Sequence, residues 1–200
     1  GSGSSDSSAA RGCGSLGSPA IRLLAQAGIG RLTLIDPDTL GWPNIGRHAL
    51  GAANVGSLKA SAMATAIRRD FPHAVGIDFF DDRIERLLKE EPDRLGRVDA
   101  IVSTTGHWPS NAAPQHWASG EAGAPPLVFG WLEPRACAGH AVVIRPPTGC
   151  LHCGFDATGQ PRFRVTEWEE GGGLVREPAC GASFQPYGAT EAMMCATMIA

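Results

Sequence analysis

A glycine-rich turn is the first feature of this sequence that could bind a ligand. Gly12, Gly14 and Gly17 follow the pattern G-x-G-x-x-G. In such a turn the first glycine permits a tight bend, the second lets the backbone approach a phosphate, and the third lets the following helix pack closely. A phosphate gains from the N–H groups and the positive dipole end of that helix. The pattern alone is a weak signal, because glycine-rich linkers also contain it, but it predicts a nucleotide-binding turn.

An acidic residue stands where a nucleotide ribose needs one. Residues 31–36 alternate apolar and polar side chains like a strand and end at Asp36. An acidic residue about 20 positions after a glycine-rich turn can accept a hydrogen bond from a ribose hydroxyl. Gly12 and Asp36 together therefore predict nucleotide binding, and on these two features the nucleotide could be a dinucleotide or ATP.

Three polar residues after Asp36 help to distinguish ATP from a dinucleotide as the ligand. They are Asn44, Arg47 and Lys59, in that order. Arg and Lys can neutralise the phosphates of ATP while the α-phosphorus is attacked, whereas a dehydrogenase has no obvious need of them here. The alternative is that Arg47 and Lys59 are ordinary surface charges. The set favours ATP and an adenylating enzyme.

Two of the six cysteines have the spacing of metal ligands. Cys150 and Cys153 are separated by two residues, which makes half of a zinc site. The alternative is a pair of reduced, partly buried thiols. The side chains that could complete a zinc site are Cys180, Cys195, His140 and His152.

Helix-like and strand-like segments alternate along the chain and must position these residues. The alternation predicts an α/β fold, with a doubly wound, mostly parallel Rossmann-like sheet and helices on both faces. A long loop is expected over 154–178. The segments expected to be helices are 18–27, 56–70, 82–91, 109–119 and 188–200. The segments expected to be strands are 31–36, 74–80, 98–103, 126–131 and 140–145.

The two ends of the sequence suggest the domain boundaries. Residues 1–10, GSGSSDSSAA, are interpreted as a flexible linker or cloning scar, since no apolar strand precedes Gly12. We therefore expect one nucleotide-binding adenylation domain over residues 11–200. The abrupt start and end favour a fragment of a longer chain.

The composition argues against several functional classes. The 200 residues carry a formal net charge of -3 with scattered basic residues, which disfavours nucleic-acid and membrane-surface binding. No apolar run approaches the roughly 20 residues of a membrane-spanning helix, and no signal peptide is recognisable. Six cysteines without a disulfide pattern fit a reducing, cytoplasmic setting.

The segments around the predicted site resemble the ThiF/MoeB family, which includes the activating enzymes for ubiquitin and ubiquitin-like proteins. The resemblance rests on GCGSLGSPAIRLLAQAGIGRLTLIDPDTL, NIGRH and VGSLKA. It implies a homodimer that binds ATP and Mg²⁺ and adenylates the C-terminal glycine carboxylate of a ubiquitin-like protein. It also implies a structural Zn²⁺ where a second Cys-x-x-Cys is present. The implied roles are phosphate binding by Gly12, Gly14 and Gly17, ribose binding by Asp36, and triphosphate contacts by Asn44, Arg47 and Lys59.

The later half resembles bacterial ThiF-type domains that occur with conjugating-enzyme-like partners, including antiphage systems. Cys180 stands where family members place a cysteine that forms a thioester or acyl persulfide, and a thiolate near a helix N-terminus suits a nucleophile. The alternative for Cys180 is an inert buried thiol. Trp131, Glu133 and His140 are candidates to shape the carboxylate channel, with ordinary packing as the alternative.

Two residues depart from the family pattern. His48 stands where the family often has Gln, and Gly106 stands where an acid that helps to hold Mg²⁺ is expected. The metal would then depend mostly on phosphate oxygens. Two other functions stay open. One is a non-catalytic scaffold with the activating-enzyme fold, which the missing acid favours. The other is an NAD(P)-dependent oxidoreductase, which the glycine turn and Asp36 permit.

Overall fold

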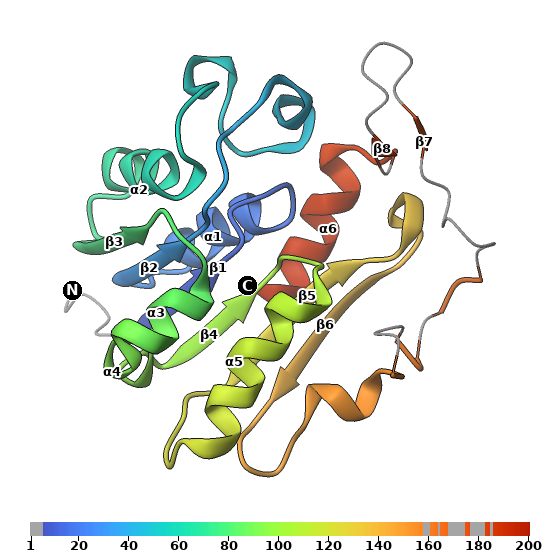
Figure 1. Cartoon of the computed structure of the whole chain (residues 1–200). Coiled ribbons are helices and arrows are strands. Elements are labelled where there is room, and N and C mark those ends of the chain that lie inside the picture. The colour runs from blue at the N-terminus through green and yellow to red at the C-terminus, as the bar shows by residue number, and fades with distance from the viewer. Residues whose placement is uncertain (1–5, 158–160, 164, 168–174, 177–182, 185) are drawn as a thin grey trace.

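The strands of the protein form one mostly parallel sheet in the order β3-β2-β1-β4-β5-β6, with helices around it (Figure 1). β1 to β5 pair in parallel, and β6 runs antiparallel to β5. The expected doubly wound α/β fold is therefore confirmed. The computed structural model describes residues 6–157, 161–163, 165–167, 175–176, 183–184 and 186–200. The strands are β1 Ser7–Arg11, β2 Arg31–Ile35, β3 Gly76–Phe80, β4 Ala100–Ser103, β5 Leu127–Leu132 and β6 Gly139–Ile144, with a separate pair β7 Val175–Arg176 and β8 Ser183–Phe184.

The first strand corrects the interpretation of residues 1–10 as a linker. β1 lies in the middle of the sheet, paired with β2 on one side and β4 on the other, and all five of its residues are buried. Ser and Ala have low strand propensity, so the segment gives no local signal, yet small side chains suit a strand covered on both faces. Ser7 also donates from its N–H and its hydroxyl to Asp99, at 2.7 and 2.9 Å. A strand does precede Gly12.

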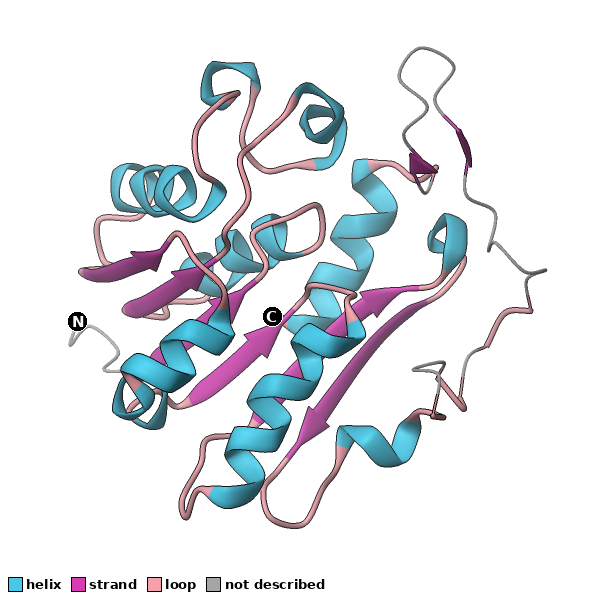
Figure 2. Ribbon diagram, in the orientation of Figure 1, coloured by secondary structure: helices cyan, strands magenta, loops and turns pink. Residues whose placement is uncertain are grey.

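The helices divide between two hydrophobic clusters, one on each face of the sheet (Figure 2). Successive β2 residues show the division, because Leu34 belongs to the cluster with α1, α2 and α6, and Ile35 to the cluster with α3, α4 and α5. Ile21 and Met63 are fully buried in the first cluster, and Leu87 in the second. The helices are α1 Gly17–Gln26, α2 Lys59–Asp70, α3 Ile84–Glu90, α4 Pro92–Gly96, α5 Trp108–Gly120 and α6 Ala189–Ile199.

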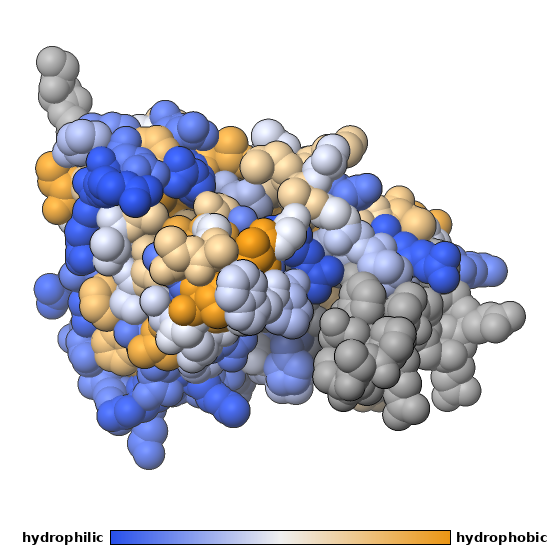
Figure 3. Space-filling view, turned by 90° about the horizontal axis from the view of Figure 1, so that it is seen from above, coloured by the Kyte–Doolittle hydropathy of each residue, from blue (hydrophilic) through white to orange (hydrophobic). Residues whose placement is uncertain are grey.

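Each helix and strand expected from the sequence has a counterpart of the same type. The largest boundary difference is in α2, which begins at Lys59 rather than at residue 56. Ahead of it lies the 3₁₀ helix η1, Trp42–Arg47, which carries two of the predicted site residues. No helix in the described part of the chain combines the length and apolar character needed to cross a membrane. Seen from above, the surface intersperses hydrophilic and hydrophobic residues (Figure 3).

Candidate nucleotide-binding site

A pocket lies where the carboxyl ends of β1, β2 and β4 meet. Strand order reverses between β1 and β4, and ligands of open α/β sheets bind at such a switch point. The pocket has a volume of ≈ 850 Å³, which suits a small-molecule ligand. Its lining comes from the glycine turn, the end of β2, η1, the loop after β4, the end of β5 and the segment before α6. The predicted nucleotide contacts that line it are Gly12, Gly14, Asp36, Arg47 and Lys59.

The glycine turn has the geometry that the G-x-G-x-x-G pattern predicts. Gly12 has φ +85°, a conformation that side chains rarely adopt. A Cβ on Gly17 would lie 1.6 Å from the carbonyl oxygen of Gly12, so only glycine lets α1 approach the turn. Gly17 therefore serves packing and is not among the residues that line the pocket. α1 begins there without a side-chain cap, and its first turn uses backbone partners instead, since the Ser18 N–H donates to the Gly14 carbonyl at 2.9 Å.

Asp36 is held in place by the backbone around it. Its Oδ2 accepts a hydrogen bond from the N–H of Cys13 at 2.6 Å, and its Oδ1 accepts one from the N–H of Asp38 at 2.8 Å. Burial raises the pKa of Asp36, and these two hydrogen bonds act in the opposite sense. The carboxyl keeps further lone pairs for a ribose hydroxyl. It therefore links the end of β2 to the glycine turn.

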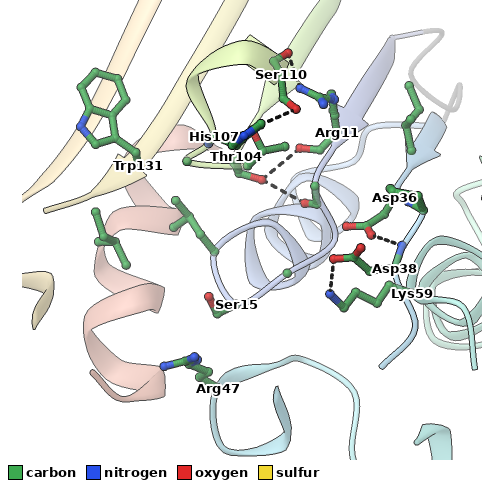
Figure 4. A pocket seen from close by; sticks show the side chains of 18 of the residues that line it. Arg11, Ser15, Asp36, Asp38, Arg47, Lys59, Thr104, His107, Ser110 and Trp131 are labelled. Atoms are coloured by element: carbon green, nitrogen blue, oxygen red, sulfur yellow. Dashed lines mark hydrogen bonds and ion pairs between the residues drawn. The ribbon is translucent and has the colours of Figure 1, made fainter. Parts of the chain in front are cut away.

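Lys59 is a buried cation at the edge of the pocket. Its side chain is only 10% exposed, and its Nζ lies 2.9 Å from Oδ2 of Asp38. Lys59 is also the first residue of α2, where the helix dipole disfavours a positive charge. Asp38 offsets part of the cost of this buried charge, and the lysine adds a positive charge to the lining of the pocket. Figure 4 shows Asp36, Asp38 and Lys59 together on one side of the turn.

Arg47 meets a residue from the far end of the chain. Its Cζ lies 4.5 Å from the ring centroid of Tyr187, a cation–π distance. The Tyr187 hydroxyl lies 2.7 Å from Oγ of Ser15 in the glycine turn. Tyr187 and Ser15 both line the pocket, and the sequence analysis assigned neither of them a role. The G-x-G-x-x-G pattern covers Ser15 only as an unspecified position, and Tyr187 belongs to no motif.

Arg11 is a second cation that the sequence analysis missed. It ends β1 with 6% of its surface exposed and lines the pocket. Its guanidinium donates to the carbonyl of Ser110 and lies 3.8 Å from the carboxylate of Glu85. Burial lowers the pKa of Arg11, and the charges of Glu85 and Asp36 raise it. The interpretation of the adjacent residues as a linker concealed this position.

Asn44 does not line the pocket. Its Oδ1 accepts a hydrogen bond from the N–H of Gly41 at 2.9 Å, which closes the first turn of η1. The residue is three positions before Arg47, so the side chain that shapes η1 also helps to place Arg47. The structure therefore gives Asn44 a local structural contact, whereas its predicted triphosphate contact stays a prediction.

The wall opposite Asp36 comes from the end of β5. Trp131 and Glu133 line the pocket there, and the ring of His140 stacks on Trp131 with centroids 4.6 Å apart. Glu133 is 5% exposed and accepts hydrogen bonds from His140 Nε2 at 2.7 Å and from the N–H groups of Val165 and Thr166 at 2.7 and 2.8 Å. Glu133 thus fastens part of the expected long loop to this wall.

The loop after β4 contributes no acid to the pocket. Thr104, Thr105 and Gly106 line the pocket in the stretch where the family pattern expects a carboxylate for Mg²⁺. Among the described residues, each pocket carboxylate already has a protein partner, and no group of three metal-ligating side chains occurs. The described side chains of the pocket therefore do not form a complete Mg²⁺ site by themselves. These carboxylates are Asp36, Asp38, Asp82 and Glu133.

The two cysteines with zinc-ligand spacing do not line this pocket. Cys150 and Cys153 are exposed, and the hydrogen bond that Cys153 makes with Cys150 raises the pKa of Cys153. Among the described residues no third ligand joins this pair. Cys195 is buried near the carbonyls of Trp131 and His140. The proposed nucleophile, Cys180, lies outside the described residues.

Comparison with known proteins agrees with this geometry. The ATP-dependent ubiquitin transferase-like protein Cap2 of Pseudomonas aeruginosa is 31% identical over 160 residues, covering 76% of this chain and 27% of Cap2. The adenylyltransferase and sulfurtransferase MOCS3 of Mus musculus is 48% identical over 59 residues, 29% of this chain and 13% of MOCS3. The crystal structure of E. coli tRNA N6-threonylcarbamoyladenosine dehydratase, TcdA, in complex with ATP aligns with a TM-score of 0.54 and 28% identity over 62% of this chain and 50% of TcdA.

The match at the level of the family is much longer. This chain spans half or less of each of the three relatives, and their activities belong to longer proteins. The ThiF family model, in contrast, matches residues 5–198, which begins before the boundary expected at residue 11 and includes β1. The chain belongs to the ThiF family.

Proposed function

We propose that this chain binds ATP and adenylates a carboxylate. One observation carries the proposal: the glycine turn, Asp36 and the cations Arg47 and Lys59, which are distant in sequence, line one pocket at the switch point of the sheet. The triphosphate would lie against the turn and the N-terminus of α1, with the ribose at Asp36. The TcdA complex supports the choice of ATP, since that relative was solved with it.

The chemistry that follows is nucleophilic substitution at phosphorus. A substrate carboxylate oxygen attacks the α-phosphorus of ATP, the bond from that phosphorus to the bridging oxygen breaks, and pyrophosphate leaves with the electron pair. The product is an acyl-adenylate. Lys59 and Arg47 would stabilise the negative charge on the phosphates, so catalysis would come from positioning and electrostatics. Mg²⁺ bound to ATP would take its ligands mainly from phosphate and water oxygens.

The carboxylate is proposed to belong to the C-terminal glycine of a ubiquitin-like protein. The name of Cap2 supports this choice, and the wall formed by Trp131 and Glu133 offers a surface beyond the phosphates. The Cys180 thiolate would then attack the acyl carbon and release AMP, giving a thioester. A homodimer, a conjugating-enzyme-like partner and a Zn²⁺ at Cys150 and Cys153 complete the proposal.

ATP–pyrophosphate exchange tests the proposal directly. The purified chain is incubated with ATP, labelled pyrophosphate and a ubiquitin-like protein ending in glycine, with the same protein carrying a C-terminal amide as the control. Exchange that requires the free carboxylate is the expected result. ATP binding without exchange would favour the non-catalytic scaffold. Binding of NAD⁺ in preference to ATP would overturn the proposal in favour of an oxidoreductase.

A further inference from the structure

The two peptide groups on either side of Cys13, in the glycine turn, are each held by a side chain. The N–H of Cys13 donates to Oδ2 of Asp36 at 2.6 Å, and the carbonyl of Cys13 accepts from Nε2 of His48 at 2.6 Å. The other ring nitrogen of His48, Nδ1, accepts from the N–H of Leu50 at 3.0 Å. His48 is 9% exposed, so water competes little for these contacts.

These partners require one protonation state of His48. A carbonyl can only accept, so Nε2 must carry a hydrogen, and the Leu50 N–H can only donate, so Nδ1 must be bare. The imidazole is therefore neutral. A second proton on Nδ1 would set two N–H groups against each other and leave the Leu50 N–H unpaired. Burial lowers the pKa of His48, the bond to Cys13 raises it, and the charge of Lys59 lowers it.

The hydrogen bond from His48 to the Cys13 carbonyl also orients the N–H of Gly14. In a trans peptide the C=O and the following N–H lie in one plane and point in opposite directions. Because the carbonyl of Cys13 points at His48, the N–H of Gly14 points away from it, and Gly14 lines the pocket. In the described part of the structure this N–H has no hydrogen-bond partner. Such an N–H is the kind of donor that a phosphate takes in a glycine turn.

We propose that His48 is a positioning residue that aims the Gly14 N–H at the phosphates of the nucleotide. The proposal rests on the proposed ATP binding. Neutral His48 holds both the Cys13 carbonyl and the Leu50 N–H. A protonated His48 keeps its donor at Nε2 but presents a second N–H to the Leu50 N–H, and this repulsion displaces the ring from the turn. The charged or titratable groups near the ring are Lys59 on α2, whose charge acts on His48, the buried thiol of Cys13, and Asp36, which accepts the hydrogen bond from the Cys13 N–H.

The test compares ATP affinity, measured by calorimetry from about pH 4.5 to 8, in the wild type, His48→Gln and His48→Leu. His48→Gln keeps a donor for the carbonyl but does not titrate, whereas His48→Leu keeps neither contact. Relative to His48→Gln, the wild type should lose affinity only at pH values below the usual range of histidine, because burial lowers the pKa of His48 and protonation then displaces the ring. His48→Leu should bind about two- to tenfold more weakly than His48→Gln at every pH, the range expected for one net hydrogen bond.

His73→Gln is the matched control. Nε2 of His73 contacts the carbonyl of Ala25 at 2.7 Å, the same kind of bond at the opposite end of α1, and His73 does not line the pocket. Its affinity for ATP should follow the wild type at every pH. If His48→Leu does not fold, the comparison between the wild type and His48→Gln over the pH range still tests the proposal. If the wild type binds ATP with the same pH profile as His48→Gln, the positioning role of His48 is overturned and the proposed ATP binding is not. If the wild type does not bind ATP, the proposed function itself is overturned.

Discussion

The hydroxyl of Tyr187 lies 2.7 Å from Oγ of Ser15, so a residue just before α6 closes over the glycine turn near the start of the sequence. The same ring lies 4.5 Å from Cζ of Arg47. Tyr187 thus touches both the turn and one of the cations proposed to bind the triphosphate. Its hydroxyl and its ring make separate contacts, which can be removed one at a time.

Tyr187→Phe should remove the contact to Ser15 and keep the ring against Arg47. We expect ATP affinity to fall by about two- to fivefold, the effect of one net hydrogen bond at the lower end of its range. Tyr187→Ala should cost about threefold or more beyond that, because the cation–π contact is lost as well. Calorimetric titration with ATP measures both steps. Equal affinities for the two variants would show that the ring does not position Arg47.

Substitution of Gly17 should reduce stability, whereas substitution of Gly14 should reduce ATP binding. Gly17→Ala places a Cβ 1.6 Å from the Gly12 carbonyl oxygen, so we expect a loss of unfolding free energy of about 2–4 kcal/mol. Gly14→Ala meets no atom within 4 Å in the described structure, so its stability should stay near the wild type while the new methyl group obstructs the phosphates. Thermal unfolding and ATP titration on both variants check this. Normal ATP binding by Gly14→Ala would remove that residue from the phosphate site.

Lys59→Met should abolish most of the exchange activity and leave the fold intact. The methionine fills the buried space of the lysine stem, and Asp38 can be hydrated because its side chain is 66% exposed. We expect the exchange rate to fall by about 100-fold or more, the cost of removing one preorganised charge contact. Lys89→Met changes the only other lysine of the sequence, in the last turn of α3, and should exchange like the wild type. An active Lys59→Met variant would exclude Lys59 from the phosphate site.

Glu133 should make stability depend on pH in the acid range. Burial alone would raise the pKa of Glu133, but hydrogen bonds from Thr166, Val165 and His140 lower it from 4.5 to about 2. A carboxyl whose pKa is depressed by folding stabilises the protein above its unfolded pKa, and that stabilisation disappears as the pH falls through the folded value.

The wild type should therefore lose about 1–2 kcal/mol relative to Glu133→Gln between pH 5 and pH 2. Urea unfolding at several pH values measures the difference, with Glu121→Gln at the exposed end of α5 as the control for removal of one charge. A constant difference between wild type and Glu133→Gln across this range would show that the loop contacts to Glu133 do not form in solution.

The sequence predicted the elements with strong patterns and missed those set by distant contacts. Residues 31–35 alternate in polarity and form β2 as expected. β1 was missed, because Ser7–Ala10 carry no strand signal and are ordered by pairing with β2 and β4. The same error concealed Arg11, whose pocket position follows from its place at the end of β1.

The residues of the candidate site also fall into those that local motifs predict and those that distant contacts place. Motif spacing found Gly12, Asp36 and Lys59, which local turns and strand ends bring to the pocket. The sequence analysis gave Tyr187 no role, because its contacts to the glycine turn join residues at opposite ends of the chain. Glu133 was proposed only as a channel residue. Its hydrogen bonds to Val165 and Thr166 depend on the position of a long loop, and the local sequence does not specify that position.

The central place of β1 has a consequence for how the protein acquires its structure. Its residues pair with β2 about two dozen positions later, but Ser8 pairs with Ala100 in β4, which is made roughly 90 residues later. Until then one hydrogen-bonding edge of the first strand is exposed, and contacts of such long sequence separation form slowly. The contact between Ser15 and Tyr187 can form only later still, because the two residues are 172 positions apart. During synthesis the Tyr187 side of the pocket therefore stays open until the segment before α6 has been made and has reached the glycine turn.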